Sequence, residues 1–342
     1  MFYANFQDEE IKHRAIAGLG FFYNRYSKLM LREHSKQLYV DILMSFDSPI
    51  KLKCQVLKNL QLHLQADELR VTKNNQDFRK ELKTDGITDL KTYGDDKSTV
   101  SGAIAQLFLS PIHHCFLNKN VMIRTAAIQV ISLVLRQGLV HPIQCIKFLI
   151  AMCTDGEQIN RVKAEQQLIE LDQKYAGFLP TQFYAGLKES FKLQTALRQH
   201  PIRGFRADPP ISLLSHVYAL IRTSKAHRRA QLVCMVSRTW KARMYNYQLL
   251  SFCSHRNILI FPGPCSPLPQ VKQFDDYKKI DINLLLYIAD NLAHLTYQII
   301  EEPLFVIHHI ALLVSTSGNR PSFLKVLFEL FLNRRLFWII LT

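Results

Sequence analysis

The sequence predicts an all-α protein built as an α-solenoid, in which antiparallel helix pairs stack along one axis. Two observations support this prediction. Amphipathic helical segments recur at a nearly constant spacing, and the 342 residues include only 13 prolines and 12 glycines, too few for a β protein dense in turns. Because 48% of the residues are apolar and 21% are charged, the chain can bury a core, which excludes a disordered tail.

A repeat becomes visible when four polar residues are aligned as position zero. Each can accept hydrogen bonds from the free N–H groups of a helix start: Asp8, Asp47, Asn118 and Asp155. At offset 6 stand basic residues, namely Arg14, Lys53, Arg124 and Arg161. Small or apolar residues follow at offset 9 (Ala17, Val56, Ala127 and Ala164) and at offset 13 (Phe21, Leu60, Ile131 and Leu168). These offsets follow the 3.6-residue period, which predicts a capped helix with one packed face in each copy.

The spacing of these copies indicates the type of solenoid. Position zero recurs after 39, 71 and 37 residues, and 71 is close to two periods, so one copy is degenerate. Two antiparallel helices in a unit of this length are typical of HEAT-type repeats. The alternative is four unrelated amphipathic helices whose caps align by chance. We predict HEAT-like repeats in residues 1–65 and 103–238, separated by a polar inter-helix excursion, residues 66–102, with at most one short helix.

Two further helices are predicted before residue 238. Pro209 and Pro210 stand where a helix can begin, and one apolar face would comprise Ile211, Leu214, Val217, Tyr218 and Ile221. After a break at Thr223 and Ser224, a second helix would carry Ala230, Leu232, Val233 and Val236. The pair therefore meets at a corner near residue 224.

Two segments do not follow the repeat. Residues 239–276 form a Pro-rich insertion whose four prolines between Pro262 and Pro269 exclude a helix pair. The tail, residues 319–342, is apolar but is interrupted by Lys325, Glu329, Arg334 and Arg335. A membrane anchor is one interpretation of the tail, and a helix that packs on a protein partner, or badly formed sequence, is the interpretation we favour. No interior run of apolar residues predicts a transmembrane helix.

Catalytic, metal and export signals do not emerge from the residues. The N-terminus lacks a secretory signal, and the seven cysteines are scattered without a CxxC pair, which predicts reduced thiols in an intracellular protein. Adjacent histidines, such as His113 and His114, point about 100° apart on a helix and cannot face one ion. Gly18-Leu-Gly20 lacks the third glycine of a phosphate loop. We therefore predict a non-enzymatic protein without a cofactor.

The net charge of +15 is concentrated in two segments. Residues 198–243 hold ten lysines and arginines against one acid, Asp208, and residues 101–150 add four basic residues and no acid. Such local charge predicts an anionic partner. The most clustered residues, here named the basic corner, are Arg203, Arg206, Arg222, Lys225, His227, Arg228 and Arg229. They predict sequence-independent contact with DNA phosphates, and the alternatives are a solvated basic edge or a surface for an acidic protein.

Several strings carry a resemblance to a known family: GLVHPIQCIKFLIAMCTD from Gly138, AEQQLIELDQKYAGF from Ala164, LKCQVLKNLQ from Leu52, RGFR from Arg203, AHRRA from Ala226, LLLYIADNLA from Leu284 and EEPLFVIHHI from Glu301. Taken in their order along the chain, these strings resemble the Nipped-B-like family, the HEAT-repeat subunit of the cohesin loader. The resemblance covers residues 1 to about 238 and about 277 to 318, so residues 277–318 are expected to form C-terminal helices of the family.

The resemblance implies a nuclear protein on chromatin that, with a partner subunit, loads the cohesin ring and stimulates the cohesin ATPase. It would thereby support sister chromatid cohesion and gene regulation. ATP would be bound by cohesin, and the implied partners are cohesin subunits (the SMC heads and the kleisin) and double-stranded DNA, with no membrane. Family members are much longer, and this chain resembles only their C-terminal arm. The N-terminal part that binds the loader partner subunit is missing from this chain.

The chain departs from the family pattern at both divergent segments. In the family, the helix with AHRRA continues almost directly into LLLYIADNLA, whereas residues 239–276 intervene here, and similarity stops after Gly318. Both segments resemble translated non-coding sequence or an alternative exon. A second function class is a transport-type HEAT adaptor without DNA contact. It predicts ladders of Trp and Asn, but Trp240 and Trp338 lie in the divergent segments.

Overall fold

The computed structural model describes residues 8–84, 95–198, 202–222 and 282–316, together with Arg229, Ala230, Leu232 and Met235. The predicted insertion, residues 239–276, and the predicted tail, residues 319–342, lie outside the described residues. The chain divides into two units. Unit 1 is Met1–Phe178 with Lys192–Leu197, and unit 2 is Leu179–Phe191 with Arg198–Thr342. We describe each unit by itself.

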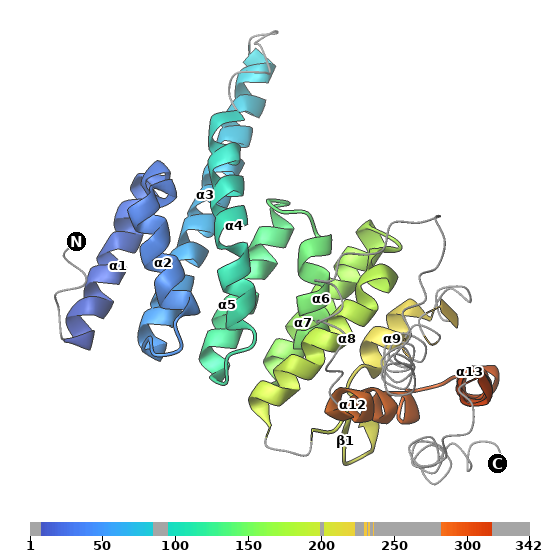
Figure 1. The fold of residues 1–342 in the computed structure, drawn as a ribbon. Coiled ribbons are helices and arrows are strands. Elements are labelled where there is room, and N and C mark those ends of the chain that lie inside the picture. Colours follow the sequence, from blue (N-terminus) through green and yellow to red (C-terminus); the bar gives the residue numbers. More distant parts are fainter. Residues whose placement is uncertain are drawn as a thin grey trace, which may run out of the picture. The chain divides into compact units, whose positions relative to one another are not determined.

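Unit 1 is a two-layer stack of helices. Helices α1, α3, α5 and α7 pack on one another in succession, while α2 packs on α4 in a second layer (Figure 1). The elements are α1 (Glu9–Arg25), the 3-10 helix η2 (Ser27–Leu31), α2 (Glu33–Met44), α3 (Ile50–Thr84), α4 (Asp95–Cys115), α5 (Val121–Arg136), α6 (Ile143–Met152), α7 (Gln158–Lys174) and α8 (Phe178–Leu197), which contributes to both units. This alternation of layers confirms the predicted α-solenoid.

The aligned polar residues mark helix starts, but only one of them is the N-cap. Asp8 caps α1 by accepting a 2.9 Å hydrogen bond from the Glu10 N–H. Asp47, Asn118 and Asp155 instead lie three residues before the first helical residue of α3, α5 and α7. Asn118 and Asp155 accept the N–H two residues on, at 2.9 and 3.0 Å, so they order the turn that leads into the helix. The predicted cap position is therefore wrong for these copies, although the repeat alignment holds.

Two of the basic residues at offset 6 bind the turn before their own helix, and one of them, Arg124, also joins neighbouring repeats. The Arg124 Nε and Nη2 atoms donate to the two carboxylate oxygens of Asp155, each at 2.8 Å. Its Nη1 atom donates to the backbone oxygens of Asn118 and Lys119. Arg161 makes the same kind of bond, to the backbone oxygens of Asp155 and Gly156. We name Lys53, Arg124 and Arg161 the basic ladder, since each stands at offset 6 of a packed repeat.

The core of unit 1 lies between its two layers. Asn59 of α3 joins them, because its Nδ2 group donates to the Ile16 backbone oxygen and to the Tyr39 hydroxyl, both at 2.8 Å. Gly20 permits this contact, since a Cβ there would lie 2.3 Å from the Asn59 side chain. The offset-13 side chains Leu60, Ile131 and Leu168 are buried, as the repeat predicts, whereas Phe21 in the first copy is 73% exposed.

The segment predicted as a polar excursion contains more helix than the sequence suggested. Helix α3 continues to Thr84, and α4 begins at Asp95, so most of residues 66–102 are helical. Residues 66–84 contain neither proline nor glycine, so their high charge is compatible with a helix and does not indicate a loop. Figure 1 shows α3 and α4 extending together beyond the ends of the neighbouring helices.

Unit 2 places a short hairpin against helices from the C-terminal segment. Strands β1 (Phe205–Arg206) and β2 (Ile211–Ser212) are antiparallel, with Phe205 opposite Ser212. The helices are α9 (Ser215–Ile221), α12 (Ile282–Ala293) and α13 (Glu301–Thr316). A buried cluster joins α8, the hairpin and α12, and it comprises Phe191, Ile202, Leu213 and Tyr287.

The hairpin corrects the prediction of a helix that begins at the prolines. Proline disfavours the helical conformation in the residue before it, and Pro209 and Pro210 here belong to the turn between β1 and β2. The helix starts later, at Ser215, and Ile211 lies in the strand instead. The remaining predicted apolar positions are buried: Leu214, Val217, Tyr218 and Ile221.

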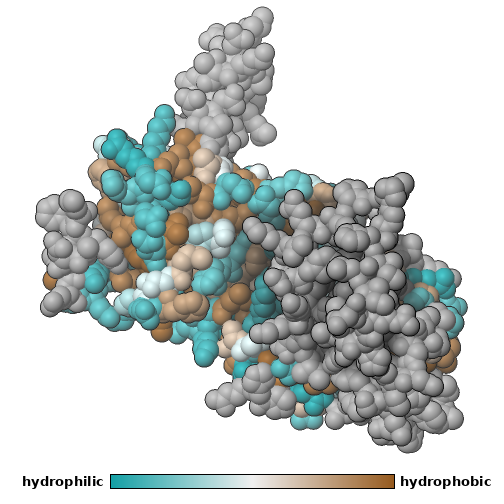
Figure 2. Space-filling model, viewed as in Figure 1, coloured by the Kyte–Doolittle hydropathy of each residue, from teal (hydrophilic) through white to brown (hydrophobic). Residues whose placement is uncertain are grey.

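Within the described ranges, no helix has the length and apolar character needed to cross a membrane. Figure 2 shows teal and brown side chains interleaved on the visible face. The most exposed large apolar side chains of unit 1 belong to the first helices and the loop before α3, with Phe46 at 87% and Phe21 at 73%. Apolar groups at a surface favour contacts with other proteins.

Candidate functional site

The structure describes four of the seven residues of the basic corner. Arg203, Arg206, Arg222 and Arg229 all belong to unit 2. Lys225, His227 and Arg228 lie outside the described residues. The four described arginines therefore show what the corner does within the fold.

Arg203 forms a two-pronged ion pair with a carboxylate of α12. Its Nε atom lies 2.6 Å from Oδ2 of Asp290, and its Nη2 atom lies 2.9 Å from Oδ1. The guanidinium also lies 4.7 Å from the centre of the Phe205 ring. The hydrogen bonds with Asp290 raise the pKa of Arg203 above its usual value, since the carboxylate favours the charged form. This charge is therefore compensated inside the protein.

Gly204 allows the hairpin to approach α12 closely. Its N–H donates to Oδ2 of Asp290 at 3.3 Å. A Cβ at this position would lie 2.4 Å from the Tyr287 backbone oxygen and 2.5 Å from the Asn291 amide nitrogen, so a side chain cannot be accommodated without movement. The next residue, Phe205, packs its ring on His294, with ring centres 4.2 Å apart. The string RGFR is thus a docking element for α12.

Buried hydrogen bonds complete this contact. The Ser212 hydroxyl donates to the Asn291 side-chain oxygen at 2.8 Å, and the Ser212 N–H donates to the His294 backbone oxygen at 2.9 Å. Asn291 is fully buried and donates to the Tyr287 backbone oxygen at 2.8 Å. Two strings that carry the family resemblance, RGFR and LLLYIADNLA, therefore bind each other across the insertion.

The remaining described arginines make more exposed contacts with the same C-terminal segment. Arg222 donates to the Thr296 backbone oxygen at 2.9 Å. Arg229 lies 3.7 Å from the Glu301 carboxylate, and both side chains are at least half exposed. Arg206, at the end of β1, is exposed. Because solvent and salt weaken such contacts, Arg222 and Arg229 keep more of their charge available to an external anion than Arg203 does.

Two of the four basic residues in the second basic segment, residues 101–150, are paired with acids. Arg124 is 2% exposed and is paired with Asp155, whose pKa stays below its usual value although burial acts to raise it, because hydrogen bonds from Arg124, the Glu157 N–H and Asn160 outweigh burial. Arg136 lies 2.6 Å from the Glu68 carboxylate. Arg124 therefore serves the fold, whereas Arg136, whose side chain is 59% exposed, makes a surface ion pair.

The residues that sequence reasoning missed are the acids that face the corner. Asp290 lies 87 residues after Arg203, and Glu301 follows Arg229 across the insertion. One signal was available, because Asp290 and Asn291 interrupt the otherwise apolar LLLYIADNLA. A polar pair on an apolar helix indicates buried hydrogen bonds, and this one could have predicted a partner.

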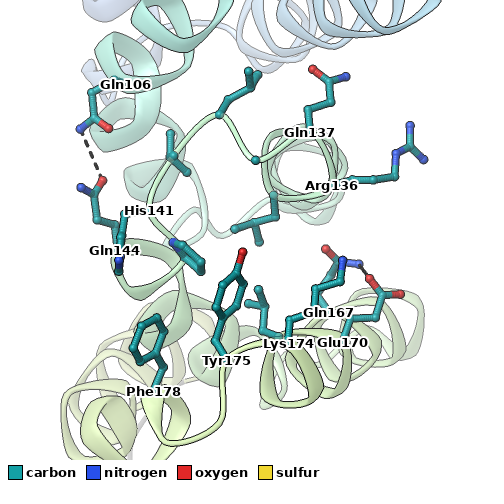
Figure 3. Close-up of a pocket in the computed structure, with 16 residues that line it drawn as sticks. Gln106, Arg136, Gln137, His141, Gln144, Gln167, Glu170, Lys174, Tyr175 and Phe178 are labelled. Atoms are coloured by element: carbon teal, nitrogen blue, oxygen red, sulfur yellow. Dashed lines mark hydrogen bonds between the residues drawn. The ribbon is translucent and has the colours of Figure 1, made fainter. Parts of the chain in front are cut away.

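A groove in unit 1 collects amide and aromatic side chains (Figure 3). Its volume is about 620 Å³, and it lies between α4, the loop from α5 to α6, and the end of α7. Gln106 and Gln144 are joined by a 3.4 Å hydrogen bond, and the rings of Tyr175 and Phe178 stack with centres 5.7 Å apart. Gly138, at φ +67°, forms the turn that shapes one wall. These groups can hydrogen-bond a polypeptide, but nothing in the structure identifies an occupant.

Several buried histidine and cysteine side chains of unit 1 are held in their neutral forms. Burial, helped by the charge of Lys147, lowers the pKa of His113 to about 3. Burial also raises the pKa of the Cys115 and Cys145 thiols to about 12, and that of Cys153 well above its usual value. Within the ranges that the structure describes, His, Cys, Asp and Glu form no group of three or more that could hold a metal ion.

Comparison with known proteins identifies relatives over most of the chain. A family model for Nipped-B, described as sister chromatid cohesion C-terminus, matches residues 101–313. The Nipped-B-like protein of Homo sapiens is 40% identical over 323 residues, which cover 93% of this chain and 10% of that protein. The Nipped-B protein of Drosophila melanogaster is 32% identical over 329 residues, with 93% of this chain and 14% of that protein covered.

A solved structure has a similar fold. The C-terminal fragment of the Chaetomium thermophilum cohesin loader SCC2 matches with a TM-score of 0.65 and 17% sequence identity, covering 91% of this chain and 20% of that one. This likeness supports the solenoid architecture. The chain spans about a tenth of the length of the human relative that it matches.

Proposed function

The chain belongs to the Nipped-B-like family, and from this membership we propose that it acts as a non-catalytic arm of a cohesin loader. The observation that carries the proposal is the 40% identity to the human relative along 93% of this chain. In this role the arm helps to load cohesin onto chromatin in the nucleus and supports sister chromatid cohesion and gene regulation. It contacts cohesin subunits, the SMC heads and the kleisin, and contributes to stimulation of the ATPase, while cohesin binds the ATP.

We further propose that the basic corner binds double-stranded DNA without reading its sequence. Support comes from the density of ten basic residues against one acid in residues 198–243. The contacts within unit 2 refine the roles. Arg203 holds α12, so we assign the phosphate contacts to the other members of the corner: Arg206, Arg222, Lys225, His227, Arg228 and Arg229.

The DNA proposal is tested by reversing charge at Lys225, Arg228 and Arg229, each to Glu, in the whole chain. Because these side chains would release counterions from DNA, duplex affinity should fall and its dependence on salt should become shallower by about one unit of log–log slope for each lost contact. The matched control changes the exposed Lys28, Lys58 and Lys73 of unit 1 to Glu, which alters net charge equally. Equal losses in both variants, or none in the first, would remove DNA from the assignment.

The cohesin part of the proposal is tested separately by co-purification. Full-length relatives with this arm intact and with this arm deleted are mixed with the cohesin core, with and without DNA, and ATP hydrolysis is followed. We expect the deletion to reduce cohesin capture and ATPase stimulation in both conditions. Undiminished capture and stimulation would contradict a scaffold role for this arm.

A further inference from the structure

Lys53 departs from the other two members of the basic ladder. It is 3% exposed, yet its amine makes no hydrogen bond or ion pair with any described residue. At the equivalent positions, Arg124 binds a carboxylate and two backbone oxygens, and Arg161 binds two backbone oxygens. Lys53 lines an open pocket, and a cation there without a partner among the described residues can accept a carboxylate from outside.

The missing partner can be located by comparing two neighbouring steps of the ladder. Between α5 and α7, Arg124 reaches across to Asp155 at position zero of the next repeat. Between α3 and α5, the residue at that position is Asn118. Asn118 keeps the backbone role, since it accepts the Asn120 N–H as Asp155 accepts the Glu157 N–H. It carries no charge, so this step has a cation and lacks its carboxylate.

A pocket lies beside Lys53 and Asn118, where this step of the ladder has no carboxylate. Its volume is about 360 Å³, and Lys53, Asn118 and Lys119 line it together with Phe46 and Ile50. It lies at the starting ends of α3 and α5, and Figure 1 shows both helices beginning at the same end of unit 1. Helix starts carry partial positive charge, and none of the described residues that line the pocket is acidic, so its electrostatics favour an anion.

The rim of the pocket is apolar and exposed. Phe46 is 87% exposed and packs edge-on against the His114 ring, with centres 5.8 Å apart, and Ile50 is 45% exposed. The amine of Lys53 is close enough to His114 to lower the pKa of that histidine, in addition to the larger effect of burial. An apolar rim around a buried cation suits an acidic side chain that has an apolar neighbour.

We propose that this pocket binds an acidic peptide segment of a protein partner. An aspartate or glutamate of the segment pairs with Lys53 in the place that Asp155 fills one step along, and an adjacent apolar side chain packs on Phe46 and Ile50. A phosphate fits less well, because the asparagine side chains already bind the N–H groups of Asn120 and Met122 at the α5 start, which leaves too few donors for its oxygens. The proposal concerns unit 1 and is independent of the basic corner.

Binding is measured by fluorescence anisotropy with the whole chain and a short labelled peptide of alternating leucine and aspartate. A second peptide, with asparagine in place of aspartate, is the probe control. We expect the aspartate peptide to bind, and Lys53→Met to weaken it about tenfold or more, because a charge-assisted bond is lost. Lys58→Met, on an exposed position of the same helix, should leave binding unchanged. Equal binding of both peptides, or unchanged binding to the Lys53→Met variant, overturns the proposal.

A second variant keeps the test decisive if Lys53→Met folds poorly. Asn118→Asp places an internal carboxylate at the vacancy, so it should abolish peptide binding and raise the melting temperature, because Lys53 gains the partner that Arg124 already has. Unchanged peptide affinity in this variant contradicts the proposal. Inorganic phosphate that binds the wild-type chain but not the Lys53→Met chain in calorimetry, together with no binding of the aspartate peptide to the wild type, identifies a small-anion site and likewise overturns the peptide assignment.

Discussion

The two units use arginine against a carboxylate in different settings. In unit 1, Arg124 and Asp155 are 2% and 0% exposed and are 31 residues apart. In unit 2, Arg203 and Asp290 are 35% and 12% exposed and are 87 residues apart. The first pair repeats a step of the solenoid, whereas the second joins a hairpin to a distant helix. The comparison teaches that some basic residues of a charged segment stabilise the fold by pairing with internal carboxylates. Only the basic residues that are not paired in this way are available to a partner.

Breaking the buried pair should have the largest effect. Arg124→Met leaves Asp155 buried without its cation and removes the bonds to two backbone oxygens, so we expect a loss of about 3–5 kcal/mol of unfolding free energy. Urea unfolding followed by circular dichroism measures it. Arg14→Met is the control, because Arg14 pairs with Glu10 on the surface, with side chains 79% and 54% exposed. A similar small change in both variants would contradict a structural role for the ladder.

Adding a methyl group at Gly204, where the hairpin approaches α12, should lower the free energy of unfolding by a smaller amount. Gly204→Ala places a Cβ against the backbone of Tyr287 and the side chain of Asn291, and we expect a loss of about 1–3 kcal/mol. Faster amide exchange in α12, read by mass spectrometry, locates the effect in unit 2. Gly18→Ala offers a matched control with the opposite sign: nothing lies within 4 Å of its Cβ, so better helix propensity should stabilise α1 by up to about 1 kcal/mol.

Replacing the partly exposed Arg203 of unit 2 should lower the free energy of unfolding moderately, by an amount that depends on salt. Arg203→Met should cost about 1–2 kcal/mol, because the paired charges remain partly solvated. Arg229→Met should change stability by less than about 0.5 kcal/mol, since its partner Glu301 is 3.7 Å away and exposed. Thermal melts at low and high salt distinguish them. A loss for Arg203→Met as large as that for Arg124→Met would erase the contrast between the units.

At acidic pH, the difference in unfolding free energy between the wild type and Arg124→Met should become smaller. The folded pKa of Asp155 lies below its usual 3.8, so its contribution is present above pH 3.8 and is lost as pH falls through the folded pKa. The difference in unfolding free energy between the two chains should therefore shrink as the pH falls below 3.8. Urea midpoints compared at neutral and acidic pH check this. A gap that stays constant would show that Asp155 does not require its charge.

The sequence predicted the helical repeat because its period is local. The spacing of Asp8, Asp47, Asn118 and Asp155 sets the helix starts of unit 1 within a few residues. The excursion was misjudged because polarity alone does not separate an exposed helix from a loop, and only the absence of proline and glycine in residues 66–84 pointed to helix. The polarity of a segment therefore has to be considered together with its proline and glycine content before a loop is predicted.

The candidate site was less predictable because charge in a sequence carries no information about its partner. The basic corner was assembled from residues that are close along the chain, whereas Asp290 and Glu301 lie beyond the insertion. The close approach at Gly204 could not be foreseen either, since its need for a missing side chain depends on α12. The vacancy at Lys53 became visible only when the ladder step could be compared with that of Arg124.

The long α3 helix has a mechanical consequence. Its 35 residues form a rod about 50 Å long, and its first half is held between α1 and α5. The rod passes beyond the packed helices together with α4 (Figure 1). Any tilt of α3 about the core around Asn59 therefore moves its far end more than its packed end. A tilt of about 5° at Asn59 would carry the far end, about 37 Å away, through about 3 Å, by the geometry of a rigid helix. Small adjustments in repeat packing are thereby amplified at a distance from where they arise.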